Sequence, residues 1–236
     1  MSGFDKTARR LRLCFVGWGA IAGRVAELLA DRQPAGVEIA AVAVRDAGRE
    51  RARIPAGARP IAGPADLAGL DIDMVIEAAG RPAVAIWGEA ALRHCGSFVI
   101  SSTSAFTDEA LLERLIAVAR EAGSRVVVPP GALGGMDALA AAAVLPLDEV
   151  VHTIIKPPRA WQGTRAADLV DLDALSECTT FFTGAARQAA GEFPQNANVA
   201  VISALAGIGL DRTLIELVAD PALSRNCHRL RVSLGS

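Results

Sequence analysis

The segment 11–30 constrains the fold more than any other part of the chain. It opens with a short apolar run at 13–16, which is typical of a buried strand, and breaks at Gly17, Gly19 and Ala22. A helical pattern follows at once. A buried strand, a glycine turn and a helix in this order are typical of the first unit of a dinucleotide-binding sheet.

The residues of this turn and of the helix start suit a phosphate site for separate physical reasons. Gly17 allows the chain to turn tightly, and Gly19 lets the backbone approach a pyrophosphate. The helix then begins at Ala20 and Ile21, where N–H groups without an intrahelical acceptor meet the positive end of the helix dipole. We therefore predict that these four residues bind a dinucleotide. The alternative is a turn with a structural role only.

The first half of the chain alternates strand and helix patterns. This alternation predicts a parallel sheet with helices on both faces, so we expect a Rossmann-type α/β domain over residues 1–130. In its first helix, Ile21, Val25, Leu28 and Leu29 are expected to form the apolar face. The predicted strands are 11–16, 37–44, 73–77, 97–101 and 125–128, and the predicted helices are 20–31, 83–94 and 107–122.

Two details of this domain follow from side-chain chemistry. Thr107 is expected to cap the helix at 107–122, because threonine favours this position. Glu77 ends a predicted strand near the place of a nicotinamide ring, with a cap or hinge role as the alternative. The segment 46–70 is rich in Ala, Gly and Pro and has no clear pattern.

The pattern changes after Pro129 and Pro130. Sheet segments and helices follow without regular alternation, which predicts a second, α+β catalytic domain over 131–236. The predicted strands are 149–156, 176–183, 213–219 and 226–233, and the predicted helices are 134–145, 184–190 and 196–208.

Composition argues against several classes of protein. The net charge is −2, aromatic residues make up 4% and tyrosine is absent, so a nucleic-acid surface is not expected. No apolar run reaches the roughly 18–20 residues of a membrane span. The four cysteines lie far apart without metal-ligand spacing, which favours thiols in a reducing cytoplasm and no metal site.

The end of the second predicted strand bears on the choice of dinucleotide. An acidic residue there holds the ribose 2′-OH of NAD, whereas an arginine accommodates the 2′-phosphate of NADP. Here Arg45 is followed by Asp46. The pair is compatible with NAD or NADP, and Arg45 leads us to expect that NADP is accepted. A solvated loop is the alternative.

Histidine is the natural candidate for acid–base work near neutral pH. His94 ends a predicted helix, where a contact with the helix dipole is favoured. His152 lies within an alternating strand, where a structural role is favoured. His228 follows a polar turn in the second half and is the remaining candidate.

Lys156 and Gly134 are candidates for binding a substrate carboxylate. Lys156 would attract it by charge, and the glycine-rich turn around Gly134 could present backbone N–H groups. An exposed lysine at a strand end and a hinge between domains are the respective alternatives.

Several strings of the second half are more specific than a glycine turn. In this order, behind a Rossmann unit, they resemble the L-aspartate dehydrogenase family over residues 11–232. The strings are GALGGMDAL at 131–139, KPP at 156–158, FPQNANVA at 193–200, AGIGLDRT at 206–213 and NCH at 226–228.

The resemblance implies an enzyme that uses NAD or NADP to deaminate L-aspartate oxidatively. Iminoaspartate would form first, then oxaloacetate and ammonia, with a link to pyridine nucleotide biosynthesis. It implies that His228 is catalytic, that Asn198 and Ala105 contact the dinucleotide, and that Asn196 is a further candidate, taken here for the substrate. Before Ala105, Thr103 and Ser104 depart from the family's usual Val-Gly.

Family members usually continue beyond the strand at 226–233, so the second domain is expected to be short at its C-terminus. An open sheet edge favours a homodimer. Two alternatives remain: a non-catalytic NAD(P)-binding paralogue, and an oxidoreductase similar to homoserine dehydrogenase or dihydrodipicolinate reductase.

Overall fold

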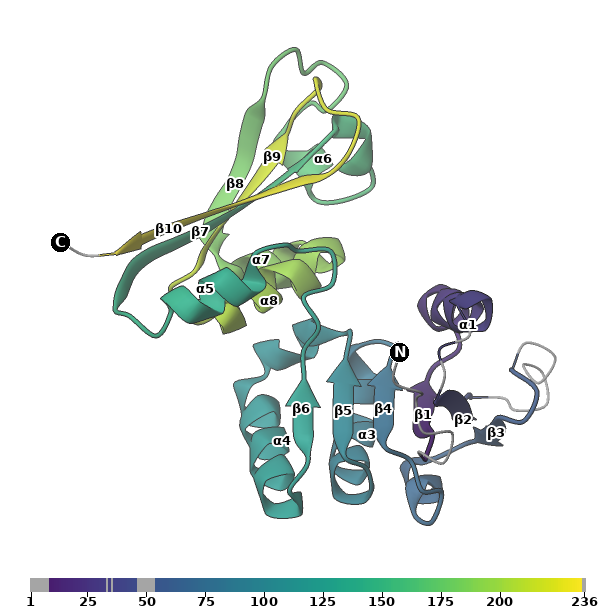
Figure 1. Cartoon of the computed structure of the whole chain (residues 1–236). Coiled ribbons are helices and arrows are strands. Elements are labelled where there is room, and N and C mark those ends of the chain that lie inside the picture. Colours follow the sequence, from purple (N-terminus) through teal and green to yellow (C-terminus); the bar gives the residue numbers. More distant parts are fainter. Residues whose placement is uncertain (1–8, 33, 35, 46–53, 235–236) are drawn as a thin grey trace, which may run out of the picture. The chain divides into compact units, whose positions relative to one another are not determined.

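The structure is a computed structural model that describes residues 9–32, 34, 36–45 and 54–234. The chain divides into two compact units, Met1–Pro129 and Pro130–Ser236 (Figure 1). The first is a parallel α/β unit and the second contains a mixed sheet with helices, as the sequence predicts.

The first unit is built on a six-stranded parallel sheet in the order β3-β2-β1-β4-β5-β6. The order reverses beside β1, because β2 and β4 flank it on opposite sides. In parallel sheets such a reversal opens a crevice at the carboxyl ends of the strands. The strands are β1 (Leu11–Val16), β2 (Val37–Ala43), β3 (Arg59–Ile61), β4 (Met74–Glu77), β5 (Ser97–Ile100) and β6 (Arg125–Val127).

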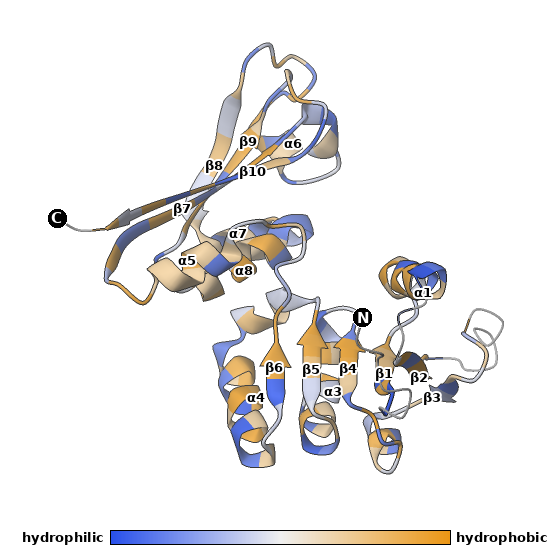
Figure 2. Cartoon of the chain, in the orientation of Figure 1, coloured by the Kyte–Doolittle hydropathy of each residue, from blue (hydrophilic) through white to orange (hydrophobic). Residues whose placement is uncertain are grey.

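Helices connect these strands and bury one side each against the sheet. Figure 2 shows this for α4, whose hydrophilic and apolar residues fall on different sides. Phe15, Phe98 and Leu115 are among the fully buried side chains of the resulting core. The helices are α1 (Ala20–Arg32), α3 (Arg81–His94) and α4 (Glu109–Ala122), with short 3₁₀ turns η2 (Pro64–Leu67) and η3 (Thr103–Thr107).

The predicted apolar face of α1 is wrong at one position. Ile21 is 63% exposed, whereas Ala22, Val25 and Leu29 pack against the core. The spacing of 22, 25 and 29 keeps these three on one side of the helix, and Ile21 lies about 100° away from Ala22. Ile21 is therefore available at the surface of the first helical turn.

The predicted cap of α4 is also wrong. Asp108, not Thr107, caps the helix, since its Oδ1 accepts a hydrogen bond from Leu111 N at 3.2 Å. The Thr107 hydroxyl is engaged in η3, where it donates to Ser104 O at 2.9 Å.

Strand β3 lies in the segment without a clear pattern. It has three residues at the sheet edge and includes Pro60, which has no N–H to donate. A strand this short carries no alternation to recognise.

Glu77 is fully buried at the end of β4 and joins the loops that follow two strands. Its Oε1 accepts from Ala79 N and Gly80 N at 2.8 Å and from Ser102 Oγ at 2.9 Å. Its Oε2 accepts from Ser102 N at 2.9 Å. The carboxyl group thus fixes the turn before α3 and the start of the loop after β5. The cap alternative is wrong, because Gly80 is the N-cap of α3 and no side chain caps this helix.

The second unit contains a four-stranded sheet in the order β10-β7-β9-β8. Strands β7 and β9 are parallel, and β10 and β8 pair antiparallel at the two edges. The helix α8 packs against α5 and α7 (Figure 1). The elements are α5 (Met136–Ala142), β7 (Leu147–Lys156), η4 (Pro158–Ala160), α6 (Ala166–Leu169), β8 (Thr179–Ala185), α7 (Ala186–Glu192), η5 (Pro194–Asn196), α8 (Ala197–Ala206), β9 (Leu214–Ala219) and β10 (Cys227–Leu234).

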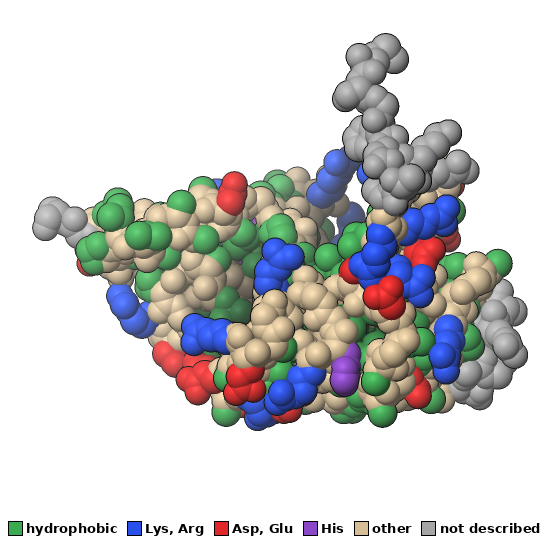
Figure 3. All heavy atoms as spheres, turned by 60° about the horizontal axis from the view of Figure 1, so that its bottom comes forward, with side chains coloured by type: hydrophobic (Ala, Val, Ile, Leu, Met, Phe, Trp, Pro, Cys, Tyr) green, Lys and Arg blue, Asp and Glu red, His purple; other side chains and the backbone are tan. Residues whose placement is uncertain are grey.

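Charged side chains on the surface are mixed in sign. Arg187 Nε lies 2.6 Å from Asp211 Oδ1, and Arg231 Nη1 lies 2.7 Å from Glu149 Oε2. Figure 3 shows basic and acidic side chains interspersed on the face that it draws. Among the described residues, every helix is too short or too polar to cross a bilayer, and all four cysteines are free thiols.

The Glu77 contacts predict a stability effect. In Glu77→Gln, an NH₂ group must face N–H donors in place of one oxygen, whichever way the amide turns. We expect the free energy of unfolding to fall by about 1–3 kcal/mol, as measured by urea denaturation.

Glu113→Gln is the matched control, because Glu113 lies on an exposed side of α4. We expect this change to stay within about 0.5 kcal/mol of the wild type. Equal unfolding free energies for the two variants would show that the Glu77 hydrogen bonds contribute no net stability.

Candidate functional site

A pocket of about 520 Å³ lies at the carboxyl ends of β1, β2 and β4 in the first unit. This is the position of the crevice that the reversed strand order predicts. The lining is mainly apolar, and Arg45 is its only charged member among the described residues. The lining residues are Val16, Gly17, Trp18, Gly19, Ala43, Val44, Arg45, Ala62, Ala78, Ala79, Pro82, Ala83, Ile86 and Trp87.

The two glycines of the turn differ in their surroundings. Gly17 has a φ of +90°, and a Cβ there would lie 2.7 Å from the Cβ of Ala79. A side chain at Gly17 would therefore be both strained and in collision. Among the described residues, a Cβ at Gly19 would meet no atom within 4 Å. No steric contact of these residues therefore calls for glycine at this position, and the space beside it is open to a ligand.

The start of α1 lies beside this pocket. Ala20 and Ile21 form its first turn, and both are exposed. N–H groups in the first turn of a helix are natural donors to phosphate oxygens. Small residues, an open space and a helix start thus fit a dinucleotide.

The end of β2 contributes the charge of this pocket. Arg45 is exposed and lines the pocket directly after β2. An arginine there can form paired hydrogen bonds to a phosphate group. Asp46 lies outside the described residues.

Ala105 is not among the described residues that line this pocket. It is 5% exposed within η3, and its N–H donates to Ser102 O at 3.0 Å. Ser102 is in turn held by Glu77. Ala105 therefore lies on a segment whose position depends on the buried carboxyl group.

In the second unit, three chemically active side chains share one face of the sheet. Side chains alternate along a strand, so His152, Ile154 and Lys156 of β7 point to the same side. His228 of β10 is paired with Ile154 and therefore points to that side as well. The helix α8 lies on this side, because its Ser203 contacts His152.

The two histidines are in hydrogen-bond contact. His228 Nδ1 lies 3.0 Å from His152 Nε2, and the ring centroids are 5.2 Å apart. His152 Nδ1 lies 2.9 Å from Ser203 Oγ. His152 and Ser203 are fully buried, whereas His228 is partly exposed. The pair thus connects the core of the unit to its surface.

Burial favours the neutral form of both rings. It lowers the pKa of His152 to about 4, with a smaller contribution from His228. Burial also lowers the pKa of His228 below its ordinary value, and the positive charge of Lys156 acts in the same direction. Near neutral pH, His228 therefore holds a lone pair that can accept a proton.

Lys156 supplies the positive charge beside this pair. Its Nζ lies 4.6 Å from the ring centroid of the buried Trp161, which gives a cation–π contact. Partial burial lowers the pKa of Lys156. An ammonium group that is partly shielded from water attracts carboxylates more strongly than a fully exposed one.

The side chain of Asn196 is buried at the start of α8. It is 4% exposed at the end of η5, and its Nδ2 has no hydrogen-bond partner among the described residues. A buried amide N–H without an acceptor costs about 1–3 kcal/mol. Such a group is consistent with an oxygen-bearing ligand. Asn196 directly precedes α8, about 10 Å along the helix from Ser203.

The other predicted residues of this unit lie at the surface. Asn198 is exposed in the first turn of α8, and Gly134 is exposed in the turn before α5. His94 ends α3 in the first unit, as predicted.

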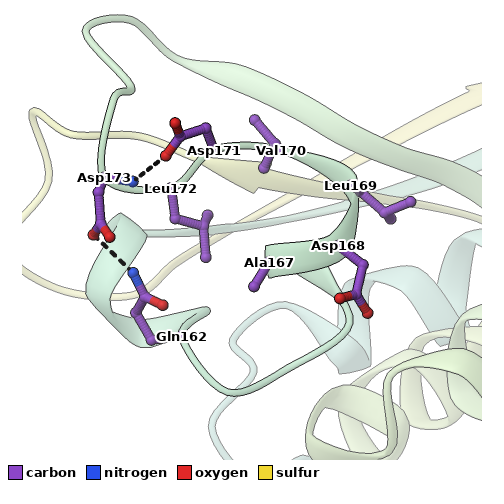
Figure 4. A pocket seen from close by; sticks show the side chains of 8 residues that line it. All are labelled: Gln162, Ala167, Asp168, Leu169, Val170, Asp171, Leu172 and Asp173. Carbon is purple, nitrogen blue, oxygen red and sulfur yellow. Dashed lines mark hydrogen bonds between the residues drawn. The ribbon is translucent and has the colours of Figure 1, made fainter.

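A second pocket, of about 390 Å³, lies in the loop around α6 (Figure 4). Its lining includes Asp168, Asp171 and Asp173, and no basic residue among those described. Gln162 Nε2 donates to Asp173 Oδ1 at 2.9 Å, and Asp171 Oδ1 accepts from Asp173 N at 3.2 Å. Carboxylates engaged in local turns make this an unsuitable site for an acidic ligand.

Sequence reasoning missed the contact of His152 with His228. Part of the arrangement can be read from the sequence. His152 and Lys156 are four positions apart on one predicted strand, so their side chains point to the same face. The register of β10 was not available, because it is set by pairing with a strand far away in the sequence.

Comparison with known families divides the chain in the same way as the structure. A family described as "Homoserine dehydrogenase, NAD binding domain" matches residues 17–129. A family described as "Aspartate dehydrogenase, C-terminal" matches residues 137–234. The second match covers the histidine pair, Lys156 and Asn196.

Individual relatives agree over most of their length. L-aspartate dehydrogenase of Brucella anthropi is 58% identical over 92% of this chain and 81% of its own. That of Cupriavidus necator is 40% identical over 93% of this chain and 83% of its own. The crystal structure of aspartate dehydrogenase from Thermotoga maritima matches with a TM-score of 0.75 and 26% identity, over 96% of this chain and 86% of that one. The chain belongs to the L-aspartate dehydrogenase family.

Proposed function

We propose that this protein catalyses the NAD(P)-dependent oxidative deamination of L-aspartate. One observation carries the proposal: His228, His152 and Lys156 share one sheet face in the unit that matches the aspartate dehydrogenase family. Together they offer a proton acceptor and a positive charge, which this substrate requires at its amine and at its carboxylates.

The reaction is a two-electron oxidation followed by hydrolysis. Aspartate loses a hydride from Cα and a proton from its amine nitrogen to give iminoaspartate. Water adds to the imine, ammonia leaves and oxaloacetate remains. When bound, the nicotinamide ring of the dinucleotide accepts the hydride.

His228 is the proposed acid–base residue. Its imidazole accepts the proton of the substrate amine and later moves a proton when water adds to the imine. Its pKa, lowered by burial and by Lys156, keeps it unprotonated and ready for this task at neutral pH.

Lys156 and Asn196 are the proposed carboxylate-binding residues. Lys156 contributes charge, and Asn196 Nδ2, which has no partner among the described residues, contributes a hydrogen bond. Gly134, exposed before the short α5, stays a prediction as a further donor.

The proposed pyrophosphate and ribose contacts come from the first unit. In the first unit, Gly17, Gly19, Ala20 and Ile21 would surround the pyrophosphate, and Arg45 would meet a 2′-phosphate, so that NADP is accepted beside NAD. Ala105 and Asn198 remain candidates because the family resemblance implies them. The homodimer, the cytoplasmic location and the link to pyridine nucleotide biosynthesis also stay predictions.

A substrate panel tests the proposed reaction. Absorbance of the reduced nicotinamide is followed with NAD⁺ or NADP⁺ and, separately, L-aspartate, D-aspartate, L-glutamate or L-homoserine. The proposal requires the highest kcat/KM for L-aspartate. Preference for L-homoserine would favour the homoserine dehydrogenase-like alternative, and no turnover with any substrate would favour a non-catalytic dinucleotide-binding protein.

Replacement of His228 should separate chemistry from binding. We expect His228→Gln to lower kcat for L-aspartate by about 10²- to 10⁴-fold, which is the usual contribution of general acid–base catalysis. His94→Gln, a histidine change outside the proposed site, is the control. A kcat of His228→Gln within about twofold of the control would contradict the catalytic role, since acid–base loss costs far more.

The pH dependence should have a defined direction. The deamination needs neutral His228, and its pKa lies below the ordinary value of about 6.5. As pH falls through this lowered pKa, kcat/KM for L-aspartate should fall. The acidic limb should therefore have a midpoint below about 6.5 and should disappear in His228→Gln. An acidic limb centred above about 7 would contradict the assignment.

Glycine replacement should test the phosphate cradle. We expect Gly19→Ala to weaken dinucleotide binding by about 10- to 100-fold. The added methyl group would occupy space that the ligand needs, which costs about 1–3 kcal/mol of binding free energy. Gly23→Ala in α1 is a matched control, because a Cβ at Gly23 would also meet no atom of the described residues within 4 Å. Equal dissociation constants for the two variants, measured by calorimetry, would exclude close approach at Gly19.

Arginine replacement should test the choice of dinucleotide. We expect Arg45→Ala to weaken NADPH binding by about tenfold relative to NADH, because a charge-assisted hydrogen bond to the 2′-phosphate is lost. Arg59→Ala is the control, since Arg59 is exposed at the amino end of β3. The ratio of the NADPH and NADH dissociation constants is compared between the two variants. An equal ratio in Arg45→Ala and Arg59→Ala would contradict a contact between Arg45 and the 2′-phosphate.

A further inference from the structure

The donor and the acceptor can be assigned for each hydrogen bond that connects Ser203, His152 and His228. Ser203 Oγ donates a hydrogen bond to the carbonyl oxygen of Ala200 at 3.0 Å. Ser203 must be the donor, because a carbonyl oxygen has no hydrogen. A hydroxyl has a single hydrogen, so toward His152 Ser203 then acts as acceptor. Serine hydroxyls in helices commonly donate to a carbonyl of the preceding turn.

The remaining contacts follow from this donor. His152 Nδ1, at 2.9 Å from Ser203 Oγ, must carry the hydrogen of that bond. A neutral imidazole has one N–H, so His152 Nε2 has a lone pair. His228 Nδ1, at 3.0 Å from that Nε2, must then be the donor. This leaves the lone pair of neutral His228 on Nε2.

We propose that His152, held by Ser203, is a positioning residue that fixes His228 in the tautomer with its basic lone pair on Nε2. The inference rests on the proposed function, since it deepens the task assigned to His228. Without an acceptor at Nδ1, His228 could place its hydrogen on either nitrogen, and the Nε2–H form cannot accept a proton there.

The surroundings suit this task. His152 is fully buried between β7 and α8, and the low pKa of its ring keeps it neutral throughout the physiological range. When His228 takes up a proton, the bond to neutral His152 becomes charge-assisted and stronger. The proton stays on His228, because a charge on the buried His152 ring would be much less solvated.

A spectroscopic test reads the tautomer directly. The chain has three histidines, so long-range ¹H–¹⁵N correlation spectra of the ¹⁵N-labelled full chain contain few ring signals. His94→Gln and His228→Gln assign them. We expect neutral His228 with hydrogen on Nδ1 and neutral His152 with hydrogen on Nδ1. A hydrogen on His228 Nε2 in the wild type would overturn the proposal.

Two variants connect the tautomer to the rate. Ser203→Ala removes the acceptor of His152 Nδ1–H with little change in volume. His152→Gln keeps an oxygen that can accept from His228. We expect Ser203→Ala to mix the His228 tautomers and to lower kcat for L-aspartate by about 10- to 100-fold, with His152→Gln nearer to wild type than His152→Leu. Unchanged tautomer and kcat in Ser203→Ala would overturn the proposal.

A double-mutant cycle excludes a merely structural effect. In a His228→Gln background, Ser203→Ala should cost no further activity, because it acts only through His228. A full additional loss would indicate a structural role and overturn the proposal. NADPH dissociation constants should stay constant throughout.

Different results would contradict the acid–base role of His228 and the positioning role of His152. If His228→Gln leaves kcat unchanged, the proposed acid–base function fails. If His228→Gln lowers kcat but the tautomer is on Nε2, only the inference about His152 fails.

Discussion

The antiparallel pairing of β10 with β7 is the constraint on which the proposed chemistry depends. It pairs His228 with Ile154, so His228 lies diagonally across from His152 on the same face. A shift of one residue in this register would turn His228 to the opposite face, away from His152 and α8. The pairing register of β10 on β7 therefore determines whether this face of the sheet carries a proton acceptor from β10.

Packing behind this pairing determines the properties of the site. The helix α8 covers His152 and supplies Ser203, and its N-terminal end carries Asn196. Burial keeps both imidazoles neutral, and Lys156 beside Trp161 adds a positive charge that is partly shielded from water. The second unit thus contains a proton acceptor, a cation and, among the described residues, an amide donor without a partner.

Local patterns in the sequence predicted most of the first unit and part of the site. The strand at 11–16 and the glycine turn were recognisable because each depends on neighbouring residues, and the structure has β1 over the same residues. Strand β3 was not, because three edge residues with a proline carry no pattern. Ile21 and Thr107 were misplaced because helix phase and capping depend on where the first turn starts.

The partnership of the histidines required information that no local pattern contains. His152 and His228 are 76 residues apart and meet only through strand pairing. The resemblance implied His228 as catalytic, whereas alternation alone favoured a structural role for His152. Its burial is indeed complete, but its hydrogen bonds connect it to the proposed site.

The reverse reaction tests the proposed chemistry most directly. Oxidation of NADH or NADPH is followed with oxaloacetate alone, with ammonium alone and with both. We expect loss of reduced-nicotinamide absorbance only when both are present, because the imine must form before hydride is transferred. Loss with oxaloacetate alone would indicate reduction of a ketone to a hydroxy acid, and no loss despite measurable dinucleotide binding would leave the site without its proposed chemistry.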